Sequence, residues 1–268
     1  MSGAETVGAL VIGAGPAGLM AAEALSEAGL PTLVAEAKPS IGRKFLMAGK
    51  SGLNLTKAEP RDAFAAAYPE GGDALSPMLA AFGPEEAVAW ARGLGIETFA
   101  GPSGRVFPVG MKASPLLRAW AGRLAGRGVA IRTRWRWRGW RAGAAIFEGP
   151  EGETAVSAPV TVLALGGGSW ARLGSDGAWR AILGAEGIGT APFRASNVGW
   201  RVDWSPAMAR HFGVPVKAVR LVAGGREATG EFVISARGIE GGGVYALGPA
   251  LRDGAALTLD LAPGRAAA

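Results

Sequence analysis

The chain has 268 residues, enough for one large domain or two smaller ones with buried cores. Lysine and arginine outnumber aspartate and glutamate by 28 to 22, and this modest excess is typical of a solvated surface rather than of a nucleic-acid-binding protein. Because there are no cysteines, disulfides, thiolate nucleophiles and cysteine-based metal sites are excluded. The apolar N-terminal stretch has no leading positive region and is interrupted by glutamates, glycines and a proline. We therefore expect neither a signal peptide nor a membrane span, and a cytoplasmic protein.

Residues 7–36 form a strand, a turn, a helix and a second strand. Residues 7–12 are an apolar run typical of a buried parallel strand, 19–28 indicate a helix, and 30–35 are a second apolar strand. Between the first strand and the helix lies a G-x-G-x-x-G sequence, made of Gly13, Ala14, Gly15, Pro16, Ala17 and Gly18. In this context the sequence predicts an α/β fold with a dinucleotide site, whose pyrophosphate lies at the N-terminus of the helix.

An acidic residue, Glu36, ends the second strand. A carboxylate at this place can accept hydrogen bonds from both hydroxyls of a ribose. It would repel a 2′-phosphate, so NADP is disfavoured at this site, whereas FAD and NAD both stay open.

The loop that follows is rich in turn-forming and cationic residues. It leaves the carboxyl end of a parallel strand, where ligands bind in open α/β sheets. Arg43, Lys44 and Lys50 can neutralise phosphates, and Asn54 and Thr56 can hydrogen-bond a polar ring edge. The alternative interpretation is a solvated surface loop.

Helices are predicted over residues 60–67, 77–82 and 84–92, a hairpin over 96–109, and a further helix from Pro115 capped by Ser114. Residues 129–140 alternate arginine with tryptophan and threonine, which predicts one strand with a buried aromatic face and an exposed arginine face. Stacking of RNA bases on this strand is the alternative, but no RNA-binding motif accompanies it, so nucleic acid is not the expected partner.

Residues 144–147 and 154–157 are expected to complete a small antiparallel meander, and 160–165 to form a buried strand that runs into glycines. From about Phe193 short strands with glycine and proline turns predominate. We therefore expect a cofactor-binding domain over residues 1–192 and part of a β-rich, barrel-like domain over 193–268. The single histidine, His211, is expected at a surface rather than in catalysis, and no metal site is predicted.

The segments quoted so far, together with residues 42–56, 104–108, 165–169 and 174–177, resemble the bacterial FAD-binding proteins known as the BaiN-like or aminoacetone oxidase family. The resemblance implies a Rossmann-type FAD-binding domain interrupted by an inserted β-barrel. It also implies which residues contact FAD: Gly13, Ala14, Gly15, Pro16, Ala17, Gly18, Glu36, Ala37, Lys38, Gly42, Arg43, Lys44, Lys50, Asn54, Thr56, Trp135, Gly166 and Gly167. No catalytic residue is assigned.

The chain departs from that family at two places. Many members carry Arg-Cys-Asn where this chain has Gly52-Leu53-Asn54, so no thiol can assist a flavin here. Members also continue into a C-terminal segment that closes over the isoalloxazine, so we expect this chain to be a truncated member with weakened flavin binding.

The sequence thus predicts an FAD-dependent oxidoreductase that acts on a small-molecule redox substrate, with NAD(P)H as an expected electron donor. Two alternatives stay open. One is an NAD-dependent dehydrogenase with a single Rossmann domain, and the other is an RNA-associated flavoprotein in which FAD is structural.

Overall fold

The computed structural model describes residues 4–68 and 70–265. It divides into two compact units, one up to Thr190 and one from Ala191 onward. The first unit contains all the segments that the sequence associates with a dinucleotide.

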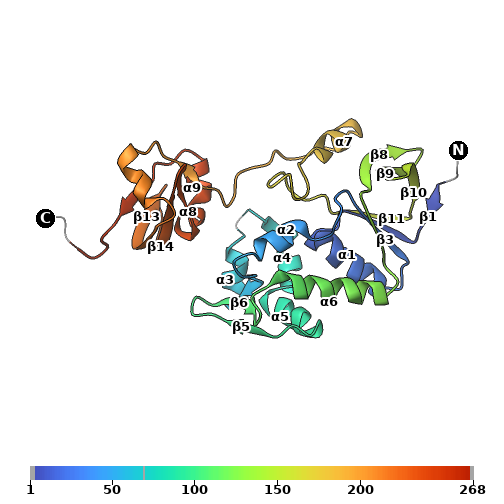
Figure 1. The fold of residues 1–268 in the computed structure, drawn as a ribbon, viewed down its shortest axis with the longest axis horizontal. Helices are drawn as coiled ribbons and strands as arrows, with labels where there is room; N and C mark the ends of the chain where they lie inside the picture. The colour runs from blue at the N-terminus through green and yellow to red at the C-terminus, as the bar shows by residue number, and fades with distance from the viewer. Residues whose placement is uncertain (1–3, 69, 266–268) are drawn as a thin grey trace. The chain divides into compact units, whose positions relative to one another are not determined.

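A four-stranded parallel sheet forms the centre of the first unit. Its strands are β2 (Ala9–Ile12), β3 (Thr32–Glu36), β7 (Ala130–Thr133) and β11 (Val160–Leu163), in the spatial order β11-β2-β3-β7. Every neighbouring pair in it is parallel. Helix α1 (Pro16–Glu27) connects β2 with β3 (Figure 1), so the predicted βαβ unit is confirmed.

The two faces of this sheet are covered differently, because alternate residues of a strand point to opposite faces. Leu10, Ile12 and Leu33 pack against the side that carries Trp137 and Phe147. Their neighbours on the strands pack against α1 and α6 (Ala113–Gly126) on the other side. The unit is therefore layered, with helices on one face of the parallel sheet and antiparallel strands on the other.

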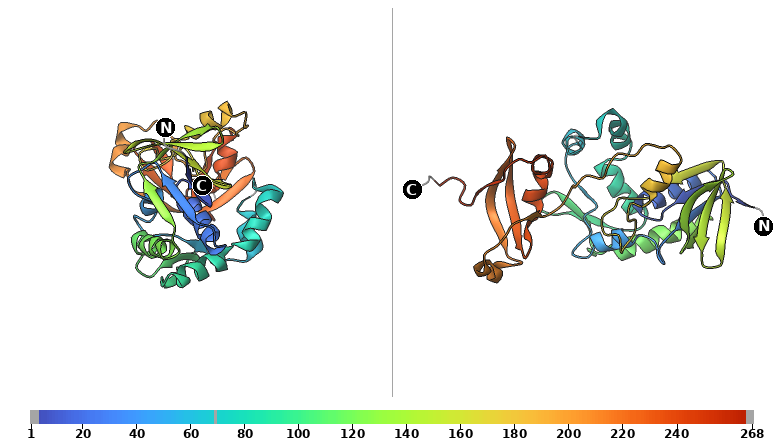
Figure 2. Two further views of the ribbon diagram at one scale, coloured as in Figure 1. Left: turned by 90° about the vertical axis from the view of Figure 1, so that its right-hand side faces the viewer. Right: turned by 90° about the horizontal axis from the view of Figure 1, so that it is seen from above.

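The antiparallel layer is the predicted meander. It consists of β8 (Arg136–Arg141), β9 (Ala144–Gly149) and β10 (Gly152–Ser157), and β1 (Glu5–Thr6) pairs with β10 at its edge. These strands lie beside the parallel sheet in both views of Figure 2. The fold class predicted from the sequence, a Rossmann-type domain with a small meander, is confirmed.

The prediction of one strand over residues 129–140 is wrong. The chain leaves the parallel sheet after Thr133, turns at Arg134 with a φ of 61°, and enters the meander at Arg136. The alternating pattern survives only in β8, where Trp137 is buried and the arginines on either side are exposed. Period-two alternation identifies strands, but it does not show that a strand changes sheet.

Two further predictions need correction. The strand over 160–165 ends at Leu163 and is not buried, since Val160 and Leu163 are 38% and 37% exposed. In the described part of the chain β11 pairs with β2 alone and so lies at the edge of the sheet. Helix α6 begins at Ala113, and its N-cap residue makes no side-chain capping bond, so Ser114 is not the cap.

A helical region completes the first unit. It contains α2 (Arg43–Ala48), β4 (Thr56–Lys57), α3 (Arg61–Ala66), α4 (Gly72–Ala81), α5 (Pro84–Gly93), β5 (Thr98–Ala100) and β6 (Arg105–Pro108). A further helix, α7 (Trp179–Ala185), packs on the meander side of the parallel sheet. Strands β5 and β6 pair as the predicted hairpin. Helix α4 starts before the predicted residue 77, because Pro77 lies inside it rather than at its first turn.

The second unit is a five-stranded antiparallel sheet, as the β-rich prediction requires. It consists of β12 (Trp200–Arg201), β13 (Pro215–Ala223), β14 (Arg226–Ser235), β15 (Gly238–Glu240) and β16 (Thr258–Asp260), with η1 (Pro206–His211), α8 (Gly242–Ala246) and α9 (Gly248–Arg252). Its core contains Leu221, Phe232 and Leu247. His211 lies at the end of η1, where its Nε2 accepts a hydrogen bond from Arg210.

Candidate dinucleotide-binding site

The glycine-rich turn between β2 and α1 has a separate physical reason for each outer glycine. Gly13 has a φ of 108°, a conformation that favours glycine, and its N–H donates to Ala35 O at 2.8 Å. A Cβ on Gly18 would lie 1.8 Å from Gly13 O, so only glycine lets α1 approach the sheet this closely. The turn therefore fixes where the helix begins.

The N-terminus of α1 presents backbone donors. Gly15 is the N-cap, and no side chain caps the helix there. The first N–H groups of a helix have no intrahelical acceptor and lie at the positive end of the helix dipole. Such an end binds phosphate groups.

The Glu36 carboxylate is held rigidly at the end of β3. Its Oε2 accepts from the N–H of Ala14 and its Oε1 from the N–H of Lys38, both at 2.8 Å. The backbone N–H of Trp135 donates to Glu36 O at 2.9 Å. The Glu36 carboxylate thus connects the glycine turn with the following loop, and the backbone carbonyl of the same residue holds the entry to the meander.

The loop after β3 is folded back onto the turn. The N–H of Gly42 donates to Ala14 O at 2.9 Å, and a Cβ on Gly42 would lie 2.7 Å from a methyl carbon of Leu117. Gly42 has a φ of 60° and is the N-cap of α2. This close approach sets Arg43 and Lys44 at the start of α2, beside the turn.

The Lys44 ammonium is half-buried and faces backbone carbonyls. Its Nζ donates to Gly167 O at 3.2 Å and to Ser175 O at 3.0 Å. Burial lowers the pKa of Lys44, and the charge of Lys38 adds to this effect, while that of Asp176 opposes it. The sequence did not indicate these carbonyl partners.

A pocket of about 270 Å³ lies between these segments. Of the predicted cofactor residues, it is lined by Gly13, Ala14, Gly15, Pro16, Ala17, Glu36, Ala37, Lys38, Gly42, Arg43, Lys44, Trp135 and Gly166. The structure thus brings thirteen of the eighteen predicted residues around one cavity.

The other predicted residues do not line the pocket. Gly18 packs beneath the turn, and Gly167 contributes a carbonyl to Lys44. Lys50 follows α2, and Asn54 leads into β4, where Thr56 pairs with Val106 of β6. Their contact with a cofactor stays a prediction.

The pocket is also lined by residues that sequence reasoning did not identify, among them Arg136, Trp137, Leu173, Asp176 and Trp179. The strand change at Arg134 brings the first two to the pocket, so the single-strand interpretation concealed them. The other three follow the glycines after β11, and that glycine run was the sequence feature that could have indicated a nearby ligand.

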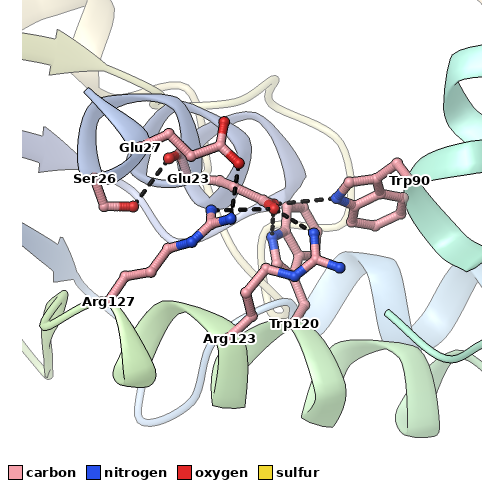
Figure 3. Close-up of polar contacts among 7 residues, drawn as sticks. All are labelled: Glu23, Ser26, Glu27, Trp90, Trp120, Arg123 and Arg127. Atoms are coloured by element: carbon pink, nitrogen blue, oxygen red, sulfur yellow. Dashed lines mark hydrogen bonds and ion pairs between the residues drawn. The ribbon is translucent and has the colours of Figure 1, made fainter. Parts of the chain in front are cut away.

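Helix α1 is anchored on its other side by a buried charged group, the Glu23 cluster, made of Glu23, Trp90, Trp120, Arg123 and Arg127 (Figure 3). Glu23 is 4% exposed. Its Oε2 accepts from the indoles of Trp120 at 2.7 Å and Trp90 at 3.1 Å, and its Oε1 from Arg123 at 2.6 Å. The cluster joins α1 to α5 and α6, away from the pocket.

Two kinds of feature are absent from the described residues. No group of three or more histidines and carboxylates in them could hold a metal ion. No helix in the described ranges is both long and apolar enough to cross a membrane.

Comparison with known proteins gives several relatives. The chain is 30% identical over 237 residues to the 3-dehydro-bile acid delta(4,6)-reductase of Clostridium scindens, covering 86% of this chain and 57% of that one. The chain therefore spans little more than half the length of this curated relative.

A solved structure shares the fold over part of the chain. A flavocytochrome c3 fumarate reductase in its open conformation superimposes with a TM-score of 0.51 at 24% identity, covering 62% of this chain and 34% of that chain. A 3-ketosteroid-delta4-(5alpha)-dehydrogenase from Rhodococcus jostii RHA1 gives a TM-score of 0.43 at 18% identity, with 62% and 47% covered.

The model of the HI0933-like protein Rossmann domain matches residues 7–246, which span the parallel sheet, the meander and most of the second unit. The chain therefore belongs to the HI0933-like family, whose Rossmann domain is an FAD-binding one.

Proposed function

We propose that the first unit binds FAD in the pocket and that the protein uses it to reduce or oxidise a small molecule. Family membership supports the cofactor, and the charge of the pocket supports a phosphate-bearing ligand. The lining contains five cationic side chains (Lys38, Arg43, Lys44, Arg136 and Arg138) and two carboxylates (Glu36 and Asp176). A pocket lined mainly by positive charge attracts a diphosphate.

Gly15 is the observation that carries the proposal. Its φ of −79° and ψ of −179° are extended backbone that any residue adopts. A Cβ added to it would meet no atom within 4 Å. Neither conformation nor packing within the protein requires glycine here, whereas a pyrophosphate that approaches the backbone does.

The residues around Gly15 fit the remaining parts of FAD. The N–H groups of Ala17 and Gly18 would donate to the pyrophosphate, and the Glu36 carboxylate would accept from the ribose hydroxyls. The flavin, when bound, supplies the redox chemistry, and the protein supplies orientation and electrostatics.

The substrate class is argued from the relative. Because the Clostridium scindens protein is a reductase of a small organic molecule, we propose reduction of a small molecule, with NAD(P)H as the electron donor. The cytoplasm stays the compartment expected from the sequence.

The test uses the whole chain with Gly15→Ala and, as matched control, Gly122→Ala. Gly122 lies in α6, and a Cβ there also meets no atom within 4 Å. We expect the unaltered protein to take up FAD with the absorbance spectrum of a bound flavin. Gly15→Ala should keep the urea unfolding midpoint but bind FAD on the order of tenfold to a hundredfold more weakly, because the Cβ displaces the pyrophosphate. Gly122→Ala should bind FAD normally.

Two outcomes would overturn the proposal. In one, Gly15→Ala binds FAD as tightly as the unaltered protein, so the pyrophosphate does not approach this backbone. In the other, the protein takes up NAD but no FAD, which would support the dehydrogenase alternative.

A further inference from the structure

The segment between β11 and α7 forms one wall of the pocket. Its first residues, up to Gly166, and its last, from Leu173 to Asp176, line the cavity, whereas residues 167–172 do not. In the described chain, residues 164–178 form neither helix nor strand. The position of this wall must therefore be set by contacts other than a regular backbone ladder.

Three cations that follow β3, one in the loop and two at the start of α2, supply such contacts. The Lys44 ammonium bridges Gly167 O and Ser175 O, which lie at the two ends of the segment. Arg43 Nε donates to Leu173 O at 3.1 Å, and Lys38 Nζ donates to Ala171 O at 3.2 Å. Lys44 thus joins the two ends of residues 167–175, and Arg43 and Lys38 bind carbonyls between those ends.

The shape of the segment also indicates external restraint. Trp170 is 69% exposed and has a φ of 53°, although a bulky residue rarely adopts this left-handed conformation. An exposed aromatic side chain gains little packing to offset that strain. Hydrogen bonds on either side of Trp170, to Gly167 O and Ala171 O, offset it instead.

The packing of the Lys44 side chain also indicates that this lysine restrains the segment. A Cβ added to Gly174 would lie 3.1 Å from Lys44 Cε and 3.5 Å from its Cδ, so the stem lies directly against the segment. The ammonium is desolvated there, and carbonyl oxygens replace its water.

We infer that Lys38, Arg43 and Lys44 form a clasp that holds residues 167–175, so that residues 164–166 and 173–176 keep their place as a wall of the dinucleotide pocket. In this clasp Lys44 is a positioning residue rather than a direct phosphate ligand. This inference rests on the proposed function for the identity of the ligand only. The clasp consists of contacts within the chain, so it can be tested without a ligand.

Trypsin provides the test, because Arg172 is exposed in the middle of the clasped segment. Lys44→Met keeps the stem and removes the donors. Lys112→Met removes the same charge from an exposed residue outside the pocket and serves as the matched control. Cleavage after Arg172 is followed by mass spectrometry of the ligand-free whole chain.

We expect cleavage after Arg172 to be about tenfold faster in Lys44→Met than in Lys112→Met, because cleavage follows the population of the opened segment. Lys38→Met, which removes a single exposed hydrogen bond, should increase the rate about twofold to threefold. It also replaces Lys44→Met as the test if that variant does not fold. Equal cleavage rates in a folded clasp variant and in the control would overturn the clasp.

Flavin binding to the same variants separates the clasp from the proposed function. If Lys44 positions the wall, Lys44→Met should release bound FAD several-fold faster, and added salt should weaken FAD binding equally in both proteins. If Lys44 contacts a phosphate directly, the variant should instead respond less to salt than the control, with unchanged cleavage. Failure of every protein to bind FAD, combined with fast cleavage of Lys44→Met, would reject the proposed function and keep the clasp.

Discussion

The Glu23 cluster and the clasp each gather cations, one between α1 and α6 and the other in the loop after β3 and at the start of α2, but they differ in the groups that accept from these cations. In the Glu23 cluster a buried carboxylate receives two arginines and two indoles, so charge meets opposite charge inside the protein. In the clasp three cations donate to uncharged backbone carbonyls beside an open pocket.

This difference indicates a division of roles between the two groups of cations. Removing either the buried carboxylate or its cationic partners leaves the other side with an uncompensated charge. The Glu23 cluster should therefore contribute strongly to the free energy of unfolding. The cations of the clasp keep their net charge, because carbonyls orient an ammonium without neutralising it. The clasp should therefore govern the wall of the pocket and its field, and affect the stability of the fold only weakly.

The largest expected effect is that of Glu23→Ala. It leaves the guanidinium of Arg123 and the indoles of Trp90 and Trp120 without their acceptor in a buried place. We expect a loss of about 3–5 kcal/mol in the free energy of unfolding, measured by urea denaturation.

Glu27→Ala is the control for this prediction. Glu27 lies one helical turn further along α1 and is 57% exposed, although it also pairs with Arg127, at 2.8 Å (Figure 3). The loss should stay below about 1 kcal/mol, as for other exposed ion pairs. Equal losses for the two variants would show that burial does not distinguish the two carboxylates.

The pH dependence of stability is the second way to test the comparison. Burial raises the pKa of Glu23, but the hydrogen bonds from Arg123, Trp90 and Trp120 and the charge of Arg123 outweigh burial, so its pKa lies below the ordinary value of 4.5. The unfolded state therefore binds the proton first, and the contribution of Glu23 is complete above pH 4.5 and lost as the pH falls through the folded-state pKa. The difference in unfolding free energy between the unaltered protein and Glu23→Gln should shrink below pH 4.5, and a constant difference would contradict this origin.

Contacts between residues close together in the sequence could be predicted for the dinucleotide site, whereas contacts between residues far apart could not. The glycine turn and Glu36 are local, because their roles follow from spacing within one βαβ unit. Lys44 was recognised as a cation near the site, but its acceptors lie at Gly167 and Ser175, more than 120 residues away. No periodicity relates those positions, so the sequence favoured a phosphate as its partner.

Glu23 was not singled out, although a signal existed. It follows Leu19 by four residues and so falls within the buried stripe of α1, where a charged residue needs a partner. Trp120, Arg123 and Arg127 recur at helical spacing on α6 and offer that partner. That α1 and α6 would lie side by side required the tertiary structure, because it depends on how the sheet orders its strands.

A smaller effect on stability is expected from the clasp. Lys44→Met removes two hydrogen bonds from a half-buried ammonium, but opening residues 167–175 does not require the parallel sheet to unfold. We expect the free energy of unfolding, from urea denaturation, to fall by about 1 kcal/mol. If Lys44→Met lowered the free energy of unfolding as much as Glu23→Ala, the clasp would be part of the folding core. The proposed difference in role between the clasp and the Glu23 cluster would then be wrong.

The smallest effect is expected at the rim of the meander. Arg141 donates to both carboxylate oxygens of Glu153 at 2.6 and 3.1 Å, a geometry as favourable as that of Arg123 on Glu23, but both side chains are exposed. Water screens this pair in the folded protein and solvates each partner when the other is removed, so good geometry alone should contribute little. Arg141→Ala should leave the urea midpoint unchanged within error at both low and high salt. A clear loss at low salt would mean that geometry matters more than burial, and the difference between the Glu23 cluster and the clasp would then need an explanation other than desolvation.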